Sequence, residues 1–182
     1  MKHLIEHLTL LVISFALFSC SSDPQWADPE GHEKTEQLQK QYGPLIVGSW
    51  HFEHVTDKQR FFERLTFKED GVLTGYRQWH ERSLTTIDGE QRYTDWKDVE
   101  SMVGSFSGRW QLQWIRNANG VGENRIVLYA EFDDVRNEMI PYNTSTLFDL
   151  SADASVLRFR NFWYQPSEGW TDYLRGYAEP GF

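Results

Sequence analysis

The chain has 182 residues, of which 40% are hydrophobic and 25% are charged, a composition typical of one soluble globular domain with a packed core. Its formal net charge of -9 argues against nucleic acids and anionic lipid headgroups as partners, because both require a basic face. Aromatic residues make up 15% of the chain, which favours strands over helices and suits the interior of a barrel.

The amino-terminal residues 1–19 are predicted to form an export signal. Lys2 and His3 precede an apolar run over residues 8–18. This run is shorter than the roughly 20 residues that a helix needs to cross a hydrocarbon core, so it favours a cleaved signal over a membrane-spanning helix.

The end of this signal, Leu17-Phe18-Ser19-Cys20, resembles the box of bacterial lipoproteins. The resemblance implies that the thiol of Cys20 carries diacylglycerol and that the mature chain begins there. Several acyl chains would hold the protein on a membrane, so that the lipid anchor is its only membrane contact. Ser21 after the cysteine implies the outer membrane of the cell envelope and leaves the leaflet open. The alternative is an ordinary secretory signal in which Cys20 is incidental.

Residues 20–43 are expected to be a polar tether. Pro24, Pro29 and Gly31 interrupt this segment, and no apolar periodicity precedes Gln37. The only regular element expected within it is one short helix over residues 33–41.

The domain over residues 44–182 is predicted to consist of strands joined by turns. Asp70-Gly71 and Asp88-Gly89 are strong hairpin signals, because a glycine there accepts a positive φ at little cost. Residues 97–104 break the pattern and are expected to form a solvated loop. The strands are expected over residues 45–55, 60–68, 72–81, 84–87, 91–96, 105–114, 124–132, 140–150, 156–164 and 170–178.

The strands alternate clearly between apolar and polar residues. In residues 105–114, for example, one face carries Phe106, Gly108, Trp110, Leu112 and Trp114. Short turns between many alternating strands predict an all-β fold, an up-and-down antiparallel β-barrel of about eight to ten strands. Closure of the barrel also removes exposed strand edges.

The opening of the first strand, Gly48-Ser49-Trp50, resembles the start of a lipocalin barrel. That resemblance implies that Gly48 lets the chain pass close to its neighbours at the closed end and that Trp50 plugs this end from inside. It also implies that an arginine from a late strand lies against the tryptophan ring. Arg175 is assigned this barrel-closing role, and Arg158 remains the other candidate.

A barrel of about eight strands is either filled by side chains or holds one ligand. The expected inward faces mix large rings with a few polar groups, which is the combination that a ligand cavity needs. The alternative is that the rings only pack the core. The candidate ligand-binding residues are Trp110, Trp114, Tyr142, Thr144, Phe159 and Asn161.

The sequence contains no recognisable catalytic or metal-binding motif. His51 and His54 are three positions apart on a strand and therefore point to opposite faces, which is poor geometry for a metal. No nucleophile motif or Gly-rich phosphate loop occurs. We therefore predict no catalytic residue, no metal and no cofactor.

These features predict a non-catalytic, lipid-anchored envelope protein that binds a small hydrophobic or amphipathic molecule inside its barrel. One alternative is a surface carbohydrate-binding module that uses exposed Trp79, Trp96, Trp163 and Trp170. Another is a structural or protein-interaction role in the envelope.

Overall fold

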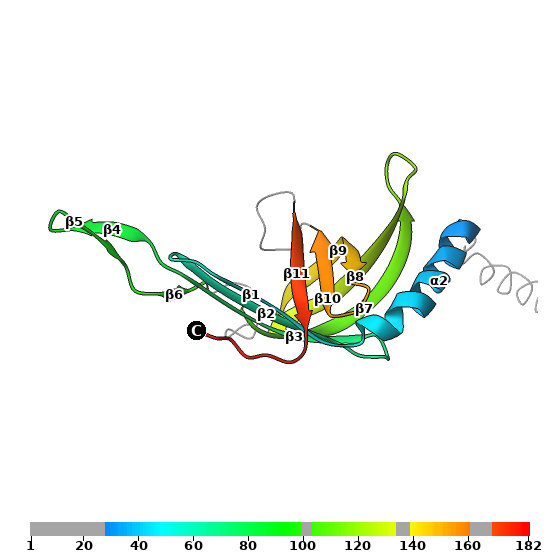
Figure 1. The fold of residues 1–182 in the computed structure, drawn as a ribbon, viewed down its shortest axis with the longest axis horizontal. Coiled ribbons are helices and arrows are strands. Elements are labelled where there is room, and N and C mark those ends of the chain that lie inside the picture. The colour runs from blue at the N-terminus through cyan, green and yellow to red at the C-terminus, as the bar shows by residue number, and fades with distance from the viewer. Residues whose placement is uncertain (1–27, 100–102, 134–138, 161–168) are drawn as a thin grey trace, which may run out of the picture.

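Eight antiparallel strands close into a barrel, which confirms the predicted fold class. The computed structural model describes residues 28–99, 103–133, 139–160 and 169–182, and Figure 1 shows their arrangement. Consecutive barrel strands pair with each other, and β1 also pairs with β11, so every strand has two neighbours. The barrel strands are β1 (Gly48–Val55), β2 (Gln59–Phe67), β3 (Val72–Glu81), β7 (Gly104–Arg116), β8 (Gly122–Asp133), β9 (Met139–Leu150), β10 (Val156–Arg160) and β11 (Trp170–Arg175).

A two-stranded arm projects from the barrel beyond the end of β3 (Figure 1). It consists of β4 (Leu84–Ile87) and β5 (Glu90–Tyr93), and its turn residues Asp88 and Gly89 have φ values of 54° and 84°. The predicted hairpin is therefore confirmed. The expected loop over residues 97–104 instead contains a short strand, β6 (Lys97–Asp98), which pairs with β3.

A helix, α2 (Pro29–Ile46), precedes the barrel and is longer at both ends than the predicted helix over residues 33–41. It begins early because Asp28 caps it by accepting a hydrogen bond from the Gly31 N–H at 3.0 Å, and because proline is well suited to the first helical position. It continues to Ile46, which is fully buried against the barrel core. For the same reason the first strand begins at Gly48 and not at residue 45.

Helix α2 covers an edge of β7 that no strand occupies. The pairing of β7 with β3 stops at Arg109. Beyond that point the Leu112 N–H donates to Gln39 of the helix at 3.4 Å, and the Trp114 N–H donates to Thr35 at 3.0 Å. The helix side chains thus satisfy backbone donors that would otherwise form an exposed strand edge.

Helix α2 leads into β1 at one end of the barrel, which we call the closed end, and β1 finishes at Val55 at the far end. Burial of the inward side chains of β1 changes along this axis. Trp50 at the closed end is fully buried, whereas Phe52 and His54, further along the same face, are partly accessible to solvent. The core over the closed end and the middle of the barrel contains Leu65, Phe67, Leu73, Trp110, Leu112, Ile126, Leu128, Phe132, Leu157, Phe159 and Tyr173.

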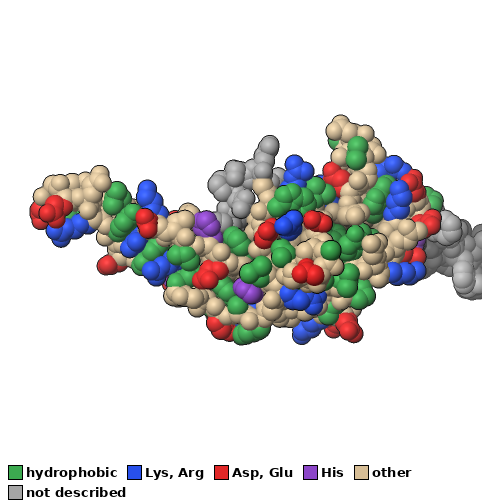
Figure 2. Space-filling model, in the orientation of Figure 1, with side chains coloured by type: hydrophobic (Ala, Val, Ile, Leu, Met, Phe, Trp, Pro, Cys, Tyr) green, Lys and Arg blue, Asp and Glu red, His purple; other side chains and the backbone are tan. Residues whose placement is uncertain are grey.

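The outer surface mixes the two signs of charge. Figure 2 shows acidic and basic side chains interspersed over the visible face, without a region of one sign. Within the part of the chain that the structure describes, no helix combines the length and apolar character needed to span a membrane. The expected signal over residues 1–19 and the first part of the tether lie outside the described residues.

Candidate functional site in the barrel interior

Trp50 lies at the closed end of the barrel, in contact with Arg175. Its indole N–H donates to the carbonyl of Ile46 at 2.7 Å, which ties the ring to the last turn of α2. The Arg175 guanidinium carbon lies 4.7 Å from the centre of the ring, within the range of a cation-π contact. The same guanidinium donates to the Ala154 carbonyl at 2.9 Å and to the Leu45 carbonyl. Arg175 therefore joins the tryptophan, the helix and the β9–β10 turn.

Gly48 has a φ of 131°, which side chains with a Cβ rarely adopt, so glycine is needed where the chain turns from α2 into β1. Arg158, the other candidate for the tryptophan contact, lies on the outer face. Its guanidinium is 3.2 Å from Asp172 and 3.9 Å from Asp149, and 45% of its side chain is exposed. The contact with Trp50 is thus made by Arg175.

A buried polar cluster lies inside the barrel above the tryptophan. The Arg77 Nε donates to Glu63 Oε2 at 2.7 Å, and a second guanidinium nitrogen of Arg77 forms an ion pair with the same oxygen. The Tyr173 hydroxyl donates to the other carboxylate oxygen at 2.7 Å. Phe61 and Phe132 lie 5.5 Å and 5.2 Å from the guanidinium carbon. The cluster is almost completely shut off from water, with exposures of 0% for Glu63, 0% for Arg77 and 1% for Tyr173.

The alternation in the sequence indicates only part of this cluster. Arg77 has the same parity as Leu73 and Trp79 in the strand expected over residues 72–81, whereas Glu63 was not identified as an inward residue. Two features could have identified Glu63 as an inward residue. Glu63 has the same parity as the apolar residues of β2, and it lies directly opposite Arg77 in the β2–β3 ladder. A carboxylate and a guanidinium facing each other in two apolar rows indicate a buried pair.

Thr171 provides a further polar group on the inner face, two residues before Tyr173. It is 1% exposed, and its hydroxyl has no hydrogen-bond partner among the residues that the structure describes. Its register partner in β10 is Phe159, which is fully buried and lies 5.1 Å from the Tyr173 ring. A buried hydroxyl without a partner is costly, and such a group in a native protein calls for an explanation.

The predicted ligand-binding residues do not gather in one pocket. Of those whose side chains are described, only Phe159 lies beside the polar cluster. Trp110 packs at the closed end, 5.2 Å from Phe67, and donates to the Lys68 carbonyl at 3.0 Å. Trp114 lies outside the barrel under α2, where the Lys34 amine is 4.3 Å from its ring centre.

The remaining predicted residues lie elsewhere or outside the described part. Thr144 lines a groove at the edge of β9. Tyr142 belongs to β9, but its side chain is outside the described residues, as are Asn161 and the predicted lipid-attachment residue Cys20. The alternation of the strands placed Trp110 and Phe159 among the buried residues, but it did not predict that Trp114 would lie under α2 or which inward residues would meet.

The tryptophans proposed for sugar stacking do not form one exposed platform. Trp79 packs edge-on against Phe61, with ring centres 5.8 Å apart. Trp96 is stacked between Arg60 and Arg82, whose guanidinium carbons are 4.2 Å and 4.3 Å from its ring centre. Trp170 is exposed, and Trp163 lies outside the described residues.

A surface cleft of about 820 Å³ lies where the arm meets the barrel. Its walls come from the β1–β2 turn, the end of β3 and the chain around β5 and β6, and they carry both signs of charge. The lining includes Asp57, Lys58, Glu81, Arg82, Tyr93, Lys97 and Asp98. Among the described residues, no group of three or more His, Cys, Asp or Glu side chains is placed to hold a metal ion.

Comparisons with models of protein families, with curated proteins and with solved structures found no match to this chain.

Proposed function

We propose that this protein is a lipid-anchored envelope protein whose barrel binds a small amphipathic molecule. In this proposal the ligand enters from the far end of the barrel, where β1 finishes, its apolar part contacts the aromatic inner wall, and its polar group hydrogen-bonds to Thr171. The protein acts by binding and performs no catalysis. Cys20 carries the lipid anchor, which is the only attachment to the membrane.

The observation that carries this proposal is the Thr171 hydroxyl, which is buried inside the barrel and has no hydrogen-bond partner in the described part of the chain. Removing such a group from water without compensation costs about 1–3 kcal/mol. A ligand that hydrogen-bonds to it would remove this cost, and the binding energy would depend directly on the hydroxyl.

The surroundings of Thr171 support a ligand with both apolar and polar parts. Phe159, Phe52 and Tyr173 provide aromatic surface on the same inner wall, with 5.1 Å between the rings of Phe159 and Tyr173 and 5.6 Å between those of Phe52 and Tyr173. The Glu63–Arg77 pair lies next to Tyr173, so this inner wall also contains charged and hydrogen-bonding groups. Apolar walls with a few oriented polar groups are typical of small-molecule sites.

Buried ion pairs also favour a functional role over a purely stabilising one. Two charges removed from water often contribute no net stability compared with apolar side chains of similar size. The Glu63–Arg77 pair is fully buried, so stability alone is a weak explanation for it, and in this proposal it holds the Tyr173 hydroxyl in place beside the bound molecule.

Native mass spectrometry of the protein purified from its own host tests the proposal. We expect an additional mass that is present in the native spectrum and absent after denaturation. Thr171→Val, which keeps the shape of the side chain and removes its hydroxyl, should lower the occupied fraction several-fold. Thr66→Val is the matched control, because Thr66 lies on β2 and its hydroxyl shares a hydrogen bond with Ser49, away from the interior cluster.

An unoccupied protein that also fails to bind fatty acids and lysophospholipids in a tryptophan-fluorescence titration would contradict the proposal. Equal occupancy of Thr171→Val and the unmodified protein would contradict the assigned role of Thr171. Labelling with a radioactive fatty acid, compared between the unmodified protein and Cys20→Ser, tests the anchor separately.

A further inference from the structure

A second polar groove lies on the outside of the barrel, at the point where β9 and β10 separate. The β9–β10 ladder ends at the pair Phe159 and Phe148, and beyond it the Thr146 hydroxyl donates to the Arg160 carbonyl. The groove has a volume of about 320 Å³. Its lining includes consecutive residues of β9, so it follows the edge of this strand. The lining residues are Glu123, Arg125, Thr144, Ser145, Thr146, Leu147 and Arg160.

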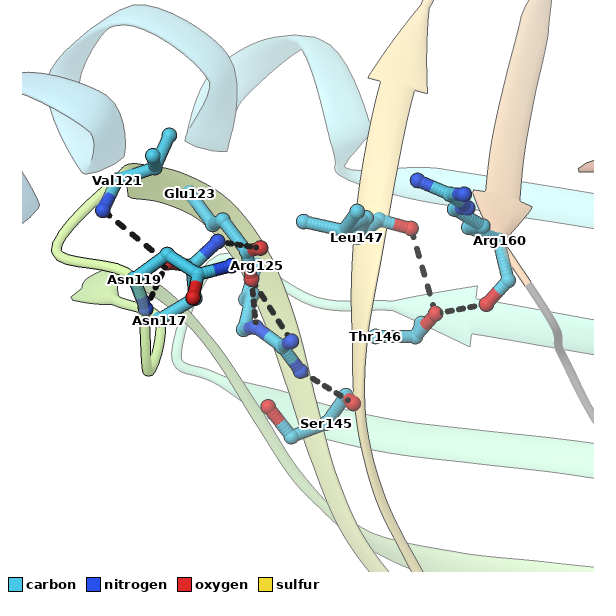
Figure 3. Close-up of polar contacts among 9 residues, drawn as sticks. All are labelled: Asn117, Asn119, Val121, Glu123, Arg125, Ser145, Thr146, Leu147 and Arg160. Atoms are coloured by element: carbon cyan, nitrogen blue, oxygen red, sulfur yellow. Dashed lines mark hydrogen bonds and ion pairs between the residues drawn. The ribbon is translucent and has the colours of Figure 1, made fainter.

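One wall of the groove is an internally balanced pair of charges. Arg125 donates from two nitrogens to one oxygen of Glu123, at 3.0 Å and 2.8 Å, and from a third nitrogen to the Ser145 carbonyl at 3.0 Å (Figure 3). Asn117 donates to the other oxygen of Glu123 at 2.9 Å. The hydrogen bonds from Asn117 and Arg125 lower the pKa of Glu123, which therefore stays ionised and holds Arg125 in place.

The other wall carries a positive charge that is not paired. Figure 3 shows Arg160 on the opposite side of β9 from Arg125. The Arg160 guanidinium forms no hydrogen bond or ion pair with any described residue, and its charge acts on Glu123 at longer range, where it adds to the lowering of the pKa of that carboxyl. The Ser145 hydroxyl, on the strand that lies between the two walls, also has no hydrogen-bond partner among the described residues. After Glu123 and Arg125 offset each other, the groove offers the positive charge of Arg160 and the unused hydroxyl of Ser145.

An exposed aromatic ring lies next to this cation. Trp170 is the register partner of Arg160 across the β10–β11 ladder. Both residues belong to the outer face of the barrel, and 43% of Trp170 is exposed. The indole thus offers an apolar surface beside the polar groove, and amphipathic rings of this kind are common where a ligand has both apolar and polar faces.

We propose that this groove binds a small saccharide that carries a negative charge, a ligand separate from the one assigned to the barrel interior. The anionic group pairs with Arg160, a sugar hydroxyl bonds to Ser145, and the C–H face of the sugar ring packs against Trp170. An arginine fork suits a carboxylate or phosphate oxygen pair. The volume of about 320 Å³ is at the small end of ligand sites, which suits one or two sugar rings and excludes a long acyl chain.

Isothermal titration calorimetry of the full-length protein with glucuronic acid, glucose and inorganic phosphate tests this site. We expect glucuronic acid to bind at least about tenfold more tightly than glucose, because one charge-assisted contact typically provides that factor. Arg160→Gln should weaken glucuronic acid binding by a similar factor, and Trp170→Ala should also weaken it. Arg158→Gln is the matched control, since Arg158 lies on the same strand and outer face but pairs with Asp172 and Asp149.

Several results would overturn the proposal. If glucuronic acid binds no better than glucose, or binds equally well to Arg160→Gln, then Arg160 does not contact an anionic group of the ligand. Inorganic phosphate that binds as tightly as glucuronic acid, with no effect of Trp170→Ala, leaves an anion site only and overturns the assignment to a sugar. A urea unfolding curve for each variant distinguishes loss of the site from loss of the fold.

Discussion

Glu63 and Arg77 face each other across the β2–β3 ladder and form an ion pair inside the barrel, with no more than 1% of either side chain exposed to solvent. We expect Arg77→Met to destabilise the protein by about 3–5 kcal/mol, because it leaves a buried carboxylate without its counter-charge. Urea unfolding followed by circular dichroism measures this change.

The triple variant Glu63→Leu, Arg77→Met and Tyr173→Phe is the control for this prediction. It removes the carboxylate, the cation and the hydroxyl that donates to Glu63 together, so none of these three described groups is left facing a missing partner. It should recover most of the lost stability, since apolar side chains of similar volume often replace a buried pair without net cost. A single Arg77→Met variant that is as stable as the unmodified protein would show that Glu63 is not held as a buried anion.

Arg175 and Trp50 allow a second prediction. Arg175→Ala removes the contact with the indole ring and the hydrogen bonds to Leu45 and Ala154. Because Arg175 is partly solvated, we expect a loss of about 1–2 kcal/mol in the free energy of unfolding. Arg158→Ala is the control and should cost less than about 1 kcal/mol, since its ion pairs are exposed. Equal losses for the two variants would contradict a special role for Arg175.

Two threonines on the inner face should respond oppositely to the same substitution. Thr146 is 6% exposed and its hydroxyl donates to the Arg160 carbonyl, whereas the hydroxyl of Thr171 has no partner. Measured without ligand, Thr146→Val should lower stability by about 1 kcal/mol, and Thr171→Val should leave it unchanged or raise it by a similar amount. Thermal unfolding of both variants shows whether each substitution raises or lowers the stability of the protein. A destabilised Thr171→Val variant would mean that its hydroxyl is hydrogen-bonded in the unliganded protein.

The barrel could be predicted from the sequence because its strands follow a simple alternation. Phe106, Trp110 and Leu112 share a parity and all are buried, and Asp88-Gly89 marks a turn that the structure contains. Gly48 and Trp50 also belong to the first strand, as the alternation predicts, and Trp50 is fully buried.

The helix and the interior cluster were harder to predict, because their stability depends on distant parts of the chain. Most residues of α2 are polar, and the helix becomes stable through its cap at Asp28 and through packing against the free edge of β7. The pairing of Glu63 with Tyr173 joins residues 110 positions apart, and only the closure of the barrel brings them together. Alternation predicts the face of a residue but not its partner.

A stack of cations and rings at the base of the arm leads to a fourth prediction. The guanidinium carbon of Arg82 lies 4.2 Å from the Tyr93 ring centre and 4.3 Å from the Trp96 ring centre. The guanidinium carbon of Arg60 also lies 4.2 Å from the Trp96 ring centre. A two-stranded ribbon is marginally stable alone, so this stack should anchor it. Trp96→Ala is expected to speed amide hydrogen exchange in residues 84–93 and to leave exchange in β7 and β8 unchanged. Unchanged exchange in the arm would mean that the stack is not what anchors it.

The Ser151–Ser155 turn leads to a prediction about pH. Hydrogen bonds from the side chain of Ser151, at 2.6 Å, and from Ser155 lower the pKa of Asp153 from 3.8 to about 2. A folded-state pKa below the unfolded value means that the ionised form stabilises the fold. This contribution is complete above pH 3.8 and is lost as the pH falls toward about 2.

Ser151→Ala should therefore raise the pKa of Asp153 toward 3.8, which a carboxyl-carbon NMR titration would detect. As a control, Asp153→Asn should show a weaker dependence of stability on pH in this range. An unchanged Asp153 pKa in Ser151→Ala would show that the Ser151 hydroxyl does not stabilise the carboxylate.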